Sequence, residues 1–82
     1  MYSHQFDITN IVSNPDREGE YLIGISGYDA EQKRGFEGQI RRDRGGYLRG
    51  SYIDPKRNPL SRSLITRIRT EVEEKIRELR KN

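Results

Sequence analysis

The apolar residues of this chain change their spacing once, and this change limits the folds that the chain can adopt. Up to residue 53 they tend to alternate with polar residues, as Phe6 and Ile8 do, which is typical of a strand with one buried face. From residue 60 they recur three or four positions apart, which is typical of an amphipathic helix. The sequence therefore predicts an antiparallel sheet followed by one helix.

Turn-forming residues divide the first part of the chain into strands. Ser13–Asp16 is one such cluster, and Asp54 with Pro55 stops the last strand. The predicted strands are Tyr2–Val12, Tyr21–Tyr28, Phe36–Arg42 and Tyr47–Ile53. We expect a single α+β domain over residues 1–82, a four-stranded antiparallel meander (β-β-β-β-α) over about residues 2–54 with one C-terminal helix packed on one face.

The predicted helix covers about residues 59–80. Its apolar stripe consists of Leu60, Leu64, Ile65, Ile68, Val72, Ile76 and Leu79. Asn58 followed by Pro59 reads as a helix start, and Ser61 or Ser63 are the alternative caps. A helix of this length must cross the shorter strands diagonally or overhang them, so Ile76 and Leu79 either form a dimer contact or lie on a frayed end.

The stretch from residue 41 to 50 predicts a hairpin. Asp43–Gly45 would form a three-residue loop with Gly45 in the left-handed conformation. The resulting pairs are Phe36–Tyr52, Gly38–Gly50 and Ile40–Leu48 on the inner face, and Glu37–Ser51, Gln39–Arg49 and Arg41–Tyr47 on the outer face. A shift by one residue would mix apolar and polar side chains on both faces, which favours this register.

Glycines on the inner face also need a reason. The strand pairing places Gly27 beside Phe36 and Ile25 beside Gly38. Glycine weakens a strand, so we interpret these positions as a shallow groove where the helix or a large ring packs closely, with close approach of a ligand as the alternative.

Composition limits the chemistry. Leu, Ile, Val and Phe total 18 of 82 residues, which predicts a folded chain with a thin core. There is no cysteine, and the one histidine, His4, cannot form a metal site alone; it lies on the apolar side of the first predicted strand, where a histidine is more often a partly buried edge residue than a catalytic base. We expect a non-enzymatic protein without metal or cofactor. No apolar run is long enough to cross a membrane, and the first residues do not resemble a signal peptide, so a soluble cytoplasmic protein is expected.

Charge is unevenly distributed. Residues 1–32 contain six acids and one base, whereas residues 33–70 contain eleven bases and three acids. Guanidinium groups form bidentate contacts with phosphate, and tyrosine offers a stacking face to an unpaired base. The sequence therefore favours nucleic acid as the partner. The predicted binding residues are Arg41, Arg42, Arg44, Tyr47, Arg49, Lys56 and Arg57.

Two other interpretations of the same residues remain. Arginines on an exposed face can simply keep the protein in solution, neutralised in part by the acidic first half. The charge division and five tyrosines also fit a protein-protein interaction module or a small homodimeric adaptor.

Overall fold

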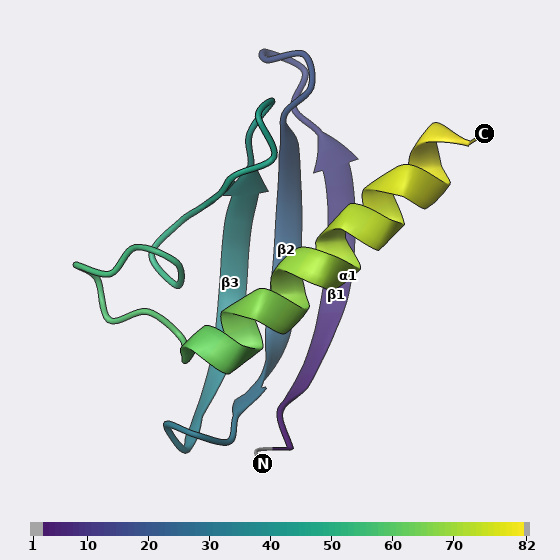
Figure 1. Ribbon diagram of the computed structural model, residues 1–82. Coiled ribbons are helices and arrows are strands. Elements are labelled where there is room, and N and C mark those ends of the chain that lie inside the picture. The colour runs from purple at the N-terminus through teal and green to yellow at the C-terminus, as the bar shows by residue number, and fades with distance from the viewer. Residues whose placement is uncertain (1–2, 82) are drawn as a thin grey trace.

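The structure, a computed structural model that describes residues 3–81, has the predicted α+β architecture. A four-stranded antiparallel sheet in the order β1-β2-β3-β4 is followed by a C-terminal helix (Figure 1). The elements are β1 (Gln5–Ser13), β2 (Tyr21–Asp29), β3 (Arg34–Arg42), β4 (Leu48–Arg49) and α1 (Arg62–Arg80).

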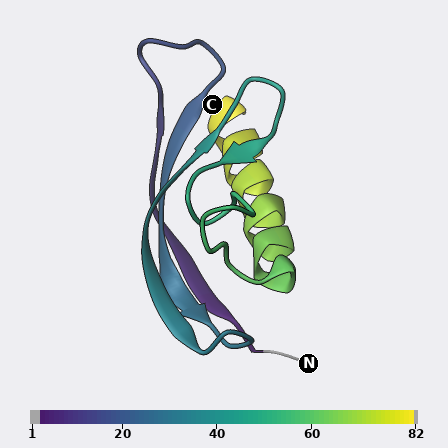
Figure 2. The same ribbon diagram turned by 90° about the vertical axis from the view of Figure 1, so that its left-hand side faces the viewer.

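The helix forms a second layer on one face of the sheet (Figure 2). It runs diagonally across the strands, as its length requires, and its C-terminal end extends past β1 (Figure 1). The core between the layers consists of Phe6, Ile23, Ile25, Phe36, Ile40, Leu48, Leu60, Leu64, Ile68, Val72 and Ile76. No described element covers the opposite, outer face, so its side chains meet solvent.

The register between β2 and β3 is the predicted one. Gly27 lies opposite Phe36, and Ile25 lies opposite Gly38. The prediction that a large ring packs closely is confirmed for Gly38, where a β-carbon would lie 2.8 Å from Cε2 of Tyr52, whereas at Gly27 a β-carbon would meet the backbone of β1. The Tyr52 ring in turn meets Phe36 edge to face, with centroids 5.7 Å apart.

The first strand differs from the prediction in its bounds and its regularity. It begins at Gln5, and Tyr2 lies outside the described residues. A bulge between Ile8 and Asn10 interrupts the alternation, and Oδ1 of Asn10 accepts a hydrogen bond from the Gly24 N–H. A bulge adds one residue to one strand only, which changes the face on which later side chains lie.

The predicted fourth strand, Tyr47–Ile53, is wrong in its length, since only Leu48 and Arg49 pair with β3. Gly50 adopts a φ of 143°, and its carbonyl accepts hydrogen bonds from the N–H groups of Ile53 and Asp54, so the chain turns away from the sheet. A side chain replaces the missing strand. The Tyr52 hydroxyl accepts a hydrogen bond from the Glu37 N–H and donates one to the Glu37 carbonyl at the edge of β3.

The predicted hairpin register is also wrong, by two residues. Arg41 lies opposite Arg49, and Arg42 lies opposite Leu48. The loop has the predicted three residues but lies one position further along, at residues 44–46, because the Asp43 N–H donates to the Tyr47 carbonyl, and the left-handed residue is Gly46, with a φ of 90°. A shift by two positions keeps every side chain on its face, so the inner and outer sets of β3 are unchanged.

The helix begins later than residue 59. Ser61 is the N-cap residue, whereas Asn58 has a φ of 59° and lies in the preceding loop. Ile76 is buried in the core, and Leu79 is 48% exposed. Of the two residues considered for a dimer contact, only Leu79 is therefore accessible.

Candidate nucleic-acid interface

Arg41 and Arg49 form the centre of the candidate interface. They lie directly opposite each other on β3 and β4, on the outer face, with side chains 53% and 60% exposed. Like charges in this position destabilise a sheet unless other groups compensate. The arrangement therefore needs carboxylates or a bound anion nearby.

One carboxylate contacts each of these arginines. Nε of Arg41 lies 3.8 Å from Oε1 of the buried Glu20, and Nε of Arg49 lies 2.9 Å from Oδ2 of Asp43. Both ion pairs use Nε, and the two terminal nitrogens of a guanidinium carry four further N–H donors. The carboxylates thus orient the arginines and leave their forked ends available to an anion.

Asp43 also organises the hairpin loop. Its Oδ1 accepts hydrogen bonds from the N–H groups of Tyr47 and Gly45, at 2.9 and 3.0 Å. The Tyr47 N–H, followed by the hydrogen bond from Arg49, holds the pKa of Asp43 below its ordinary value. The same charged group therefore shapes the loop and positions Arg49.

Adjoining hollows connect the basic residues across the surface. The largest, of about 530 Å³, is lined by Arg41, Arg49 and Arg57, with Asp54 as the acid in its lining. A second hollow, of about 320 Å³, shares Arg41 and Arg49 with the first and adds Arg17. A third, of about 430 Å³, shares Arg17 and adds Arg44. We call this surface the basic groove; its arginines are Arg17, Arg41, Arg44, Arg49 and Arg57, and its acids are Glu18, Glu20, Asp43 and Asp54.

The groove includes an arginine that the sequence interpretation missed. Arg17 is the one base among the acids of residues 1–32, so charge counting gave it no weight. The β1-β2 and β3-β4 loops lie at the same end of the sheet, which brings Arg17 to the second hairpin (Figure 1). Arg44 reaches across this gap, because a β-carbon at Gly19 would lie 3.1 Å from its Cγ.

Arg42 does not belong to the interface, contrary to the prediction. It is 8% exposed and lies on the inner face of β3, opposite Leu48. Its Nε and Nη2 donate to the two carboxylate oxygens of Glu73 on α1, at 2.8 and 3.0 Å. Since the second strand of the hairpin pairs two residues further along, Arg42 lies within the sheet instead of at its tip.

The other predicted residues are exposed. Tyr47, at 68%, is the most exposed of the large apolar side chains in residues 3–81. Lys56 and Arg57 lie in a turn in which the Lys56 N–H donates to the Asp54 side chain and the Arg57 N–H donates to the Asp54 carbonyl. Lys56 is exposed on this turn, and it does not line the hollow that Arg57 lines.

The outer sheet face is not positive throughout. Asp7 and Glu37 lie on either side of Ser26 in one row across the strands. Arg41 and Arg49 lie in another row, four residues further along β3. The arginines of the outer face therefore lie toward the hairpin end of the molecule.

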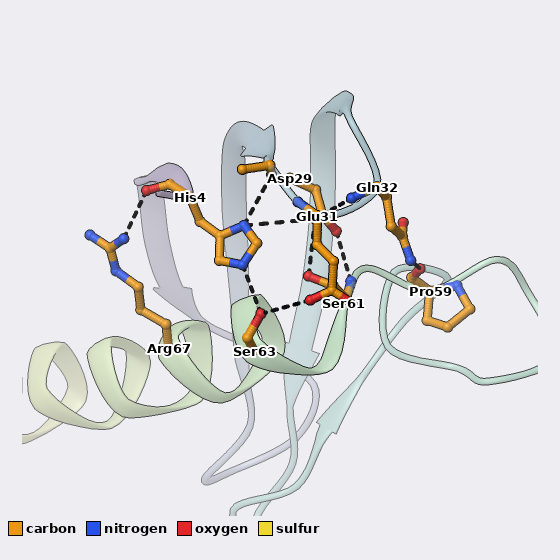
Figure 3. A network of polar contacts seen from close by, with 9 residues as sticks. His4, Asp29, Glu31, Gln32, Pro59, Ser61, Ser63 and Arg67 are labelled. Atoms are coloured by element: carbon orange, nitrogen blue, oxygen red, sulfur yellow. Dashed lines mark hydrogen bonds and ion pairs between the residues drawn. The ribbon is translucent and has the colours of Figure 1, made fainter. Parts of the chain in front are cut away.

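A separate polar network joins the other end of the sheet to the helix (Figure 3). Asp29, at the end of β2, is fully buried. Its carboxylate accepts hydrogen bonds from the N–H and hydroxyl of Ser61, at 2.7 and 3.0 Å, and from the N–H groups of Glu31 and Gln32. Burial raises the pKa of Asp29, but these hydrogen bonds, led by the Ser61 N–H, outweigh it and hold the pKa below its ordinary value.

The same network places a serine beside the only histidine, as a catalytic pair would require. Oγ of Ser63 lies 2.7 Å from Nε2 of His4, and Asp29 lies 3.7 Å from Nδ1 (Figure 3). However, the Ala30 N–H donates to Nδ1, which puts the imidazole proton on Nε2. Nε2 then donates to Ser63, whereas a general base must accept the serine proton. The sequence gave no sign of this contact, because the two residues are far apart in the chain.

Comparisons with protein-family models, with curated proteins and with solved structures find no match to this chain. Within residues 3–81, no helix is long and apolar enough to cross a membrane, and no cluster of three or more histidine, aspartate or glutamate side chains could hold a metal ion. Function must therefore be inferred from the geometry of the surface.

Proposed function

We propose that this protein binds nucleic acid through the basic groove. The observation that carries the proposal is the position of three exposed arginines, Arg41, Arg49 and Arg57, around one hollow. Because Asp43 already holds Arg49 through a hydrogen bond, binding a phosphate there costs less side-chain entropy than it would for an unrestrained arginine.

The shape of the groove favours a polymer over a single small anion. The hollows lined by Arg57, by Arg41 with Arg49, and by Arg17 with Arg44 adjoin one another. A chain of phosphates can contact several of these guanidinium groups at once, whereas one phosphate reaches only the nearest. A non-enzymatic role and a cytoplasmic location, both expected from the sequence, remain predictions.

The experiment measures the binding of fluorescently labelled random-sequence DNA and RNA by anisotropy at about 50 mM salt. Binding that weakens steeply as salt rises is expected. The triple variant Arg41→Ala, Arg49→Ala, Arg57→Ala should bind at least about ten-fold more weakly, because it loses the phosphate contacts.

The matched control is Arg69→Ala, Arg77→Ala, Arg80→Ala, which removes the same charge from exposed positions on α1. It should retain most of the affinity. Circular dichroism should show that both variants are folded. Absence of binding by the unmodified protein at this salt would overturn the proposal, and so would equal weakening by the two variants.

Self-association is the second candidate, and the outer face provides a specific reason. The acidic row with Asp7 and Glu37 and the basic row with Arg41 and Arg49 lie on either side of Gly24. A two-fold axis through Gly24 would set the acids of one copy against the arginines of another. Val12, 50% exposed, would add apolar area.

Sedimentation separates the two candidates. A dimer that dissociates on Glu37→Lys would support self-association. A monomer at every concentration tested would exclude it. Because both candidates use Arg41 and Arg49, a dimer should also lose its association when nucleic acid is added.

A further inference from the structure

Tyr47 occupies a defined position at the end of the basic groove. Its ring lies beside the backbone of Gly45, since a β-carbon there would lie 3.3 Å from Cδ2 of the ring. Gly45 itself lines the hollow that contains Arg17 and Arg44. The most exposed large apolar side chain therefore lies at the border of this hollow, beside Gly45.

The hairpin loop holds the backbone of Tyr47 in place. The Tyr47 N–H donates to Oδ1 of Asp43, and the Tyr47 carbonyl accepts from the Asp43 N–H, both at 2.9 Å. Two residues further along, Arg49 donates to the other oxygen of the same carboxylate. One carboxylate thus holds both the backbone of Tyr47, from which the ring projects, and the Arg49 guanidinium.

An exposed ring of this kind distinguishes single strands from duplexes. In a duplex, each base face is covered by its neighbours, so an aromatic side chain cannot stack on it without breaking the helix. In a single strand, unpaired bases stack on aromatic side chains while arginines contact the backbone. The adjoining hollows, of about 320 to 530 Å³, are of the size that admits single nucleotides.

We infer that the ligand is single-stranded nucleic acid, with one unpaired base stacked on Tyr47 and the backbone along Arg49, Arg41 and Arg57. This inference rests on the proposed function. It adds a ligand class and assigns Tyr47 as the residue that selects it.

The chain offers a matched control in Tyr28. It is also an exposed tyrosine, 43% exposed, but it lies on β2 opposite Gly35, at the far end of the outer face. Six residues of β2 separate its row from that of Leu22, which is opposite Arg41; this is about 20 Å along the strand. A strand bound in the basic groove should not contact Tyr28.

The experiment compares a labelled thymidine oligonucleotide of about 20 nucleotides with a duplex of the same length, each titrated with the unmodified protein, Tyr47→Ala and Tyr28→Ala. The single strand should bind more tightly than the duplex. Tyr47→Ala should weaken single-strand binding about 5- to 100-fold, as the loss of one stacking contact does, and Tyr28→Ala should leave it unchanged.

A spectroscopic measurement reports stacking directly. The protein has no tryptophan, so Tyr47→Trp and Tyr28→Trp each introduce one fluorophore. The thymidine strand should quench the fluorescence of tryptophan at position 47 and leave that at position 28 unchanged.

The outcomes separate this inference from the proposed function. If duplex and single strand bind equally, Tyr47→Ala changes neither and tryptophan 47 is not quenched, the inference is wrong and nucleic-acid binding stands. If neither nucleic acid binds the unmodified protein, both are wrong.

Discussion

Two aspartates organise turns at opposite ends of the sheet in the same way. Asp29 and Asp43 each accept two N–H groups from the residues that follow them, and each also binds a group brought from elsewhere, Ser61 or Arg49. The pKa of both carboxyls is lowered. Both turns therefore depend on a charged carboxylate, one joined to the helix and one to the candidate interface.

Asp29→Asn tests the buried member of this pair. The amide keeps one acceptor oxygen but loses the charge that several donors face, so the free energy of unfolding at pH 7 should fall by about 2 kcal/mol. Because the pKa of folded Asp29 is below its ordinary value of 3.8, the stabilisation is present above that pH and is lost as pH falls through the folded pKa. Urea unfolding of both proteins at pH 7 and at pH 3 measures the difference, which should be smaller at pH 3. A difference that does not change with pH would contradict this role.

Gly46→Ala tests the hairpin geometry. With a φ of 90°, position 46 is strained for any residue with a β-carbon, and alanine there should cost about 1 to 2 kcal/mol of unfolding free energy. Gly35→Ala is the control, since an added β-carbon meets nothing closer than 3.7 Å and the backbone there is not left-handed. Urea denaturation should show that only the change at 46 destabilises; equal effects would mean that the hairpin does not adopt this loop.

At the level of elements, several polar contacts attach the helix in addition to the apolar core, and two of them reach the sheet at widely separated positions. The N-cap residue of α1, Ser61, donates a hydrogen bond to Asp29 at the end of β2. Arg42 on β3 binds Glu73, beyond the middle of the helix. These contacts are more than ten residues apart along α1, so together with the core they specify where the helix crosses the sheet.

Replacing Arg42 and replacing Glu73 should lower the free energy of unfolding by different amounts. The Arg42 side chain is 10% exposed and that of Glu73 is 36% exposed. Glu73→Gln leaves a buried cation without its counter-ion and should cost about 3 kcal/mol, whereas Arg42→Met leaves a carboxylate that water can reach and should cost less.

A double-mutant cycle with chemical denaturation measures the loss of unfolding free energy for each single variant and for the double variant. The double variant should be more stable than Glu73→Gln alone, because removing the cation relieves the cost of its burial. Simple additivity of the two single effects would show that the two side chains do not interact in solution.

For the whole molecule, alternation and helical spacing were sufficient to predict the sheet, the helix and the face that each buries. They also predicted the β2-β3 register, in which Ile23 meets Ile40. Alternation cannot detect a shift of two residues, because such a shift leaves every side chain on its face. The sequence has adjacent glycines at 45 and 46 and does not indicate which of them takes the left-handed conformation. The predicted strand pairing of the hairpin therefore differed from the observed pairing by two residues.

The candidate interface was predictable to a similar extent. Arg41 and Arg49 are on the outer face, as alternation indicated. Alternation along β3 also places Arg42 on the inner face with Phe36 and Ile40, but its burial depends on the ion pair with Glu73, which is 31 residues away. The contribution of Arg17 depends on two loops meeting in space, and no local pattern reports such a contact.

The measurement that tests the central claim most directly is the salt dependence of binding to a single-stranded oligonucleotide. Each phosphate neutralised on a single strand contributes about −0.7 to the slope of log K against log salt. If Arg41, Arg49 and Arg57 each contact one phosphate, replacing all three by alanine should make the slope shallower by about 2. Slopes that are the same for the triple variant and the unmodified protein, or a slope of zero for the unmodified protein, would contradict the assignment of the basic groove as a nucleic-acid interface.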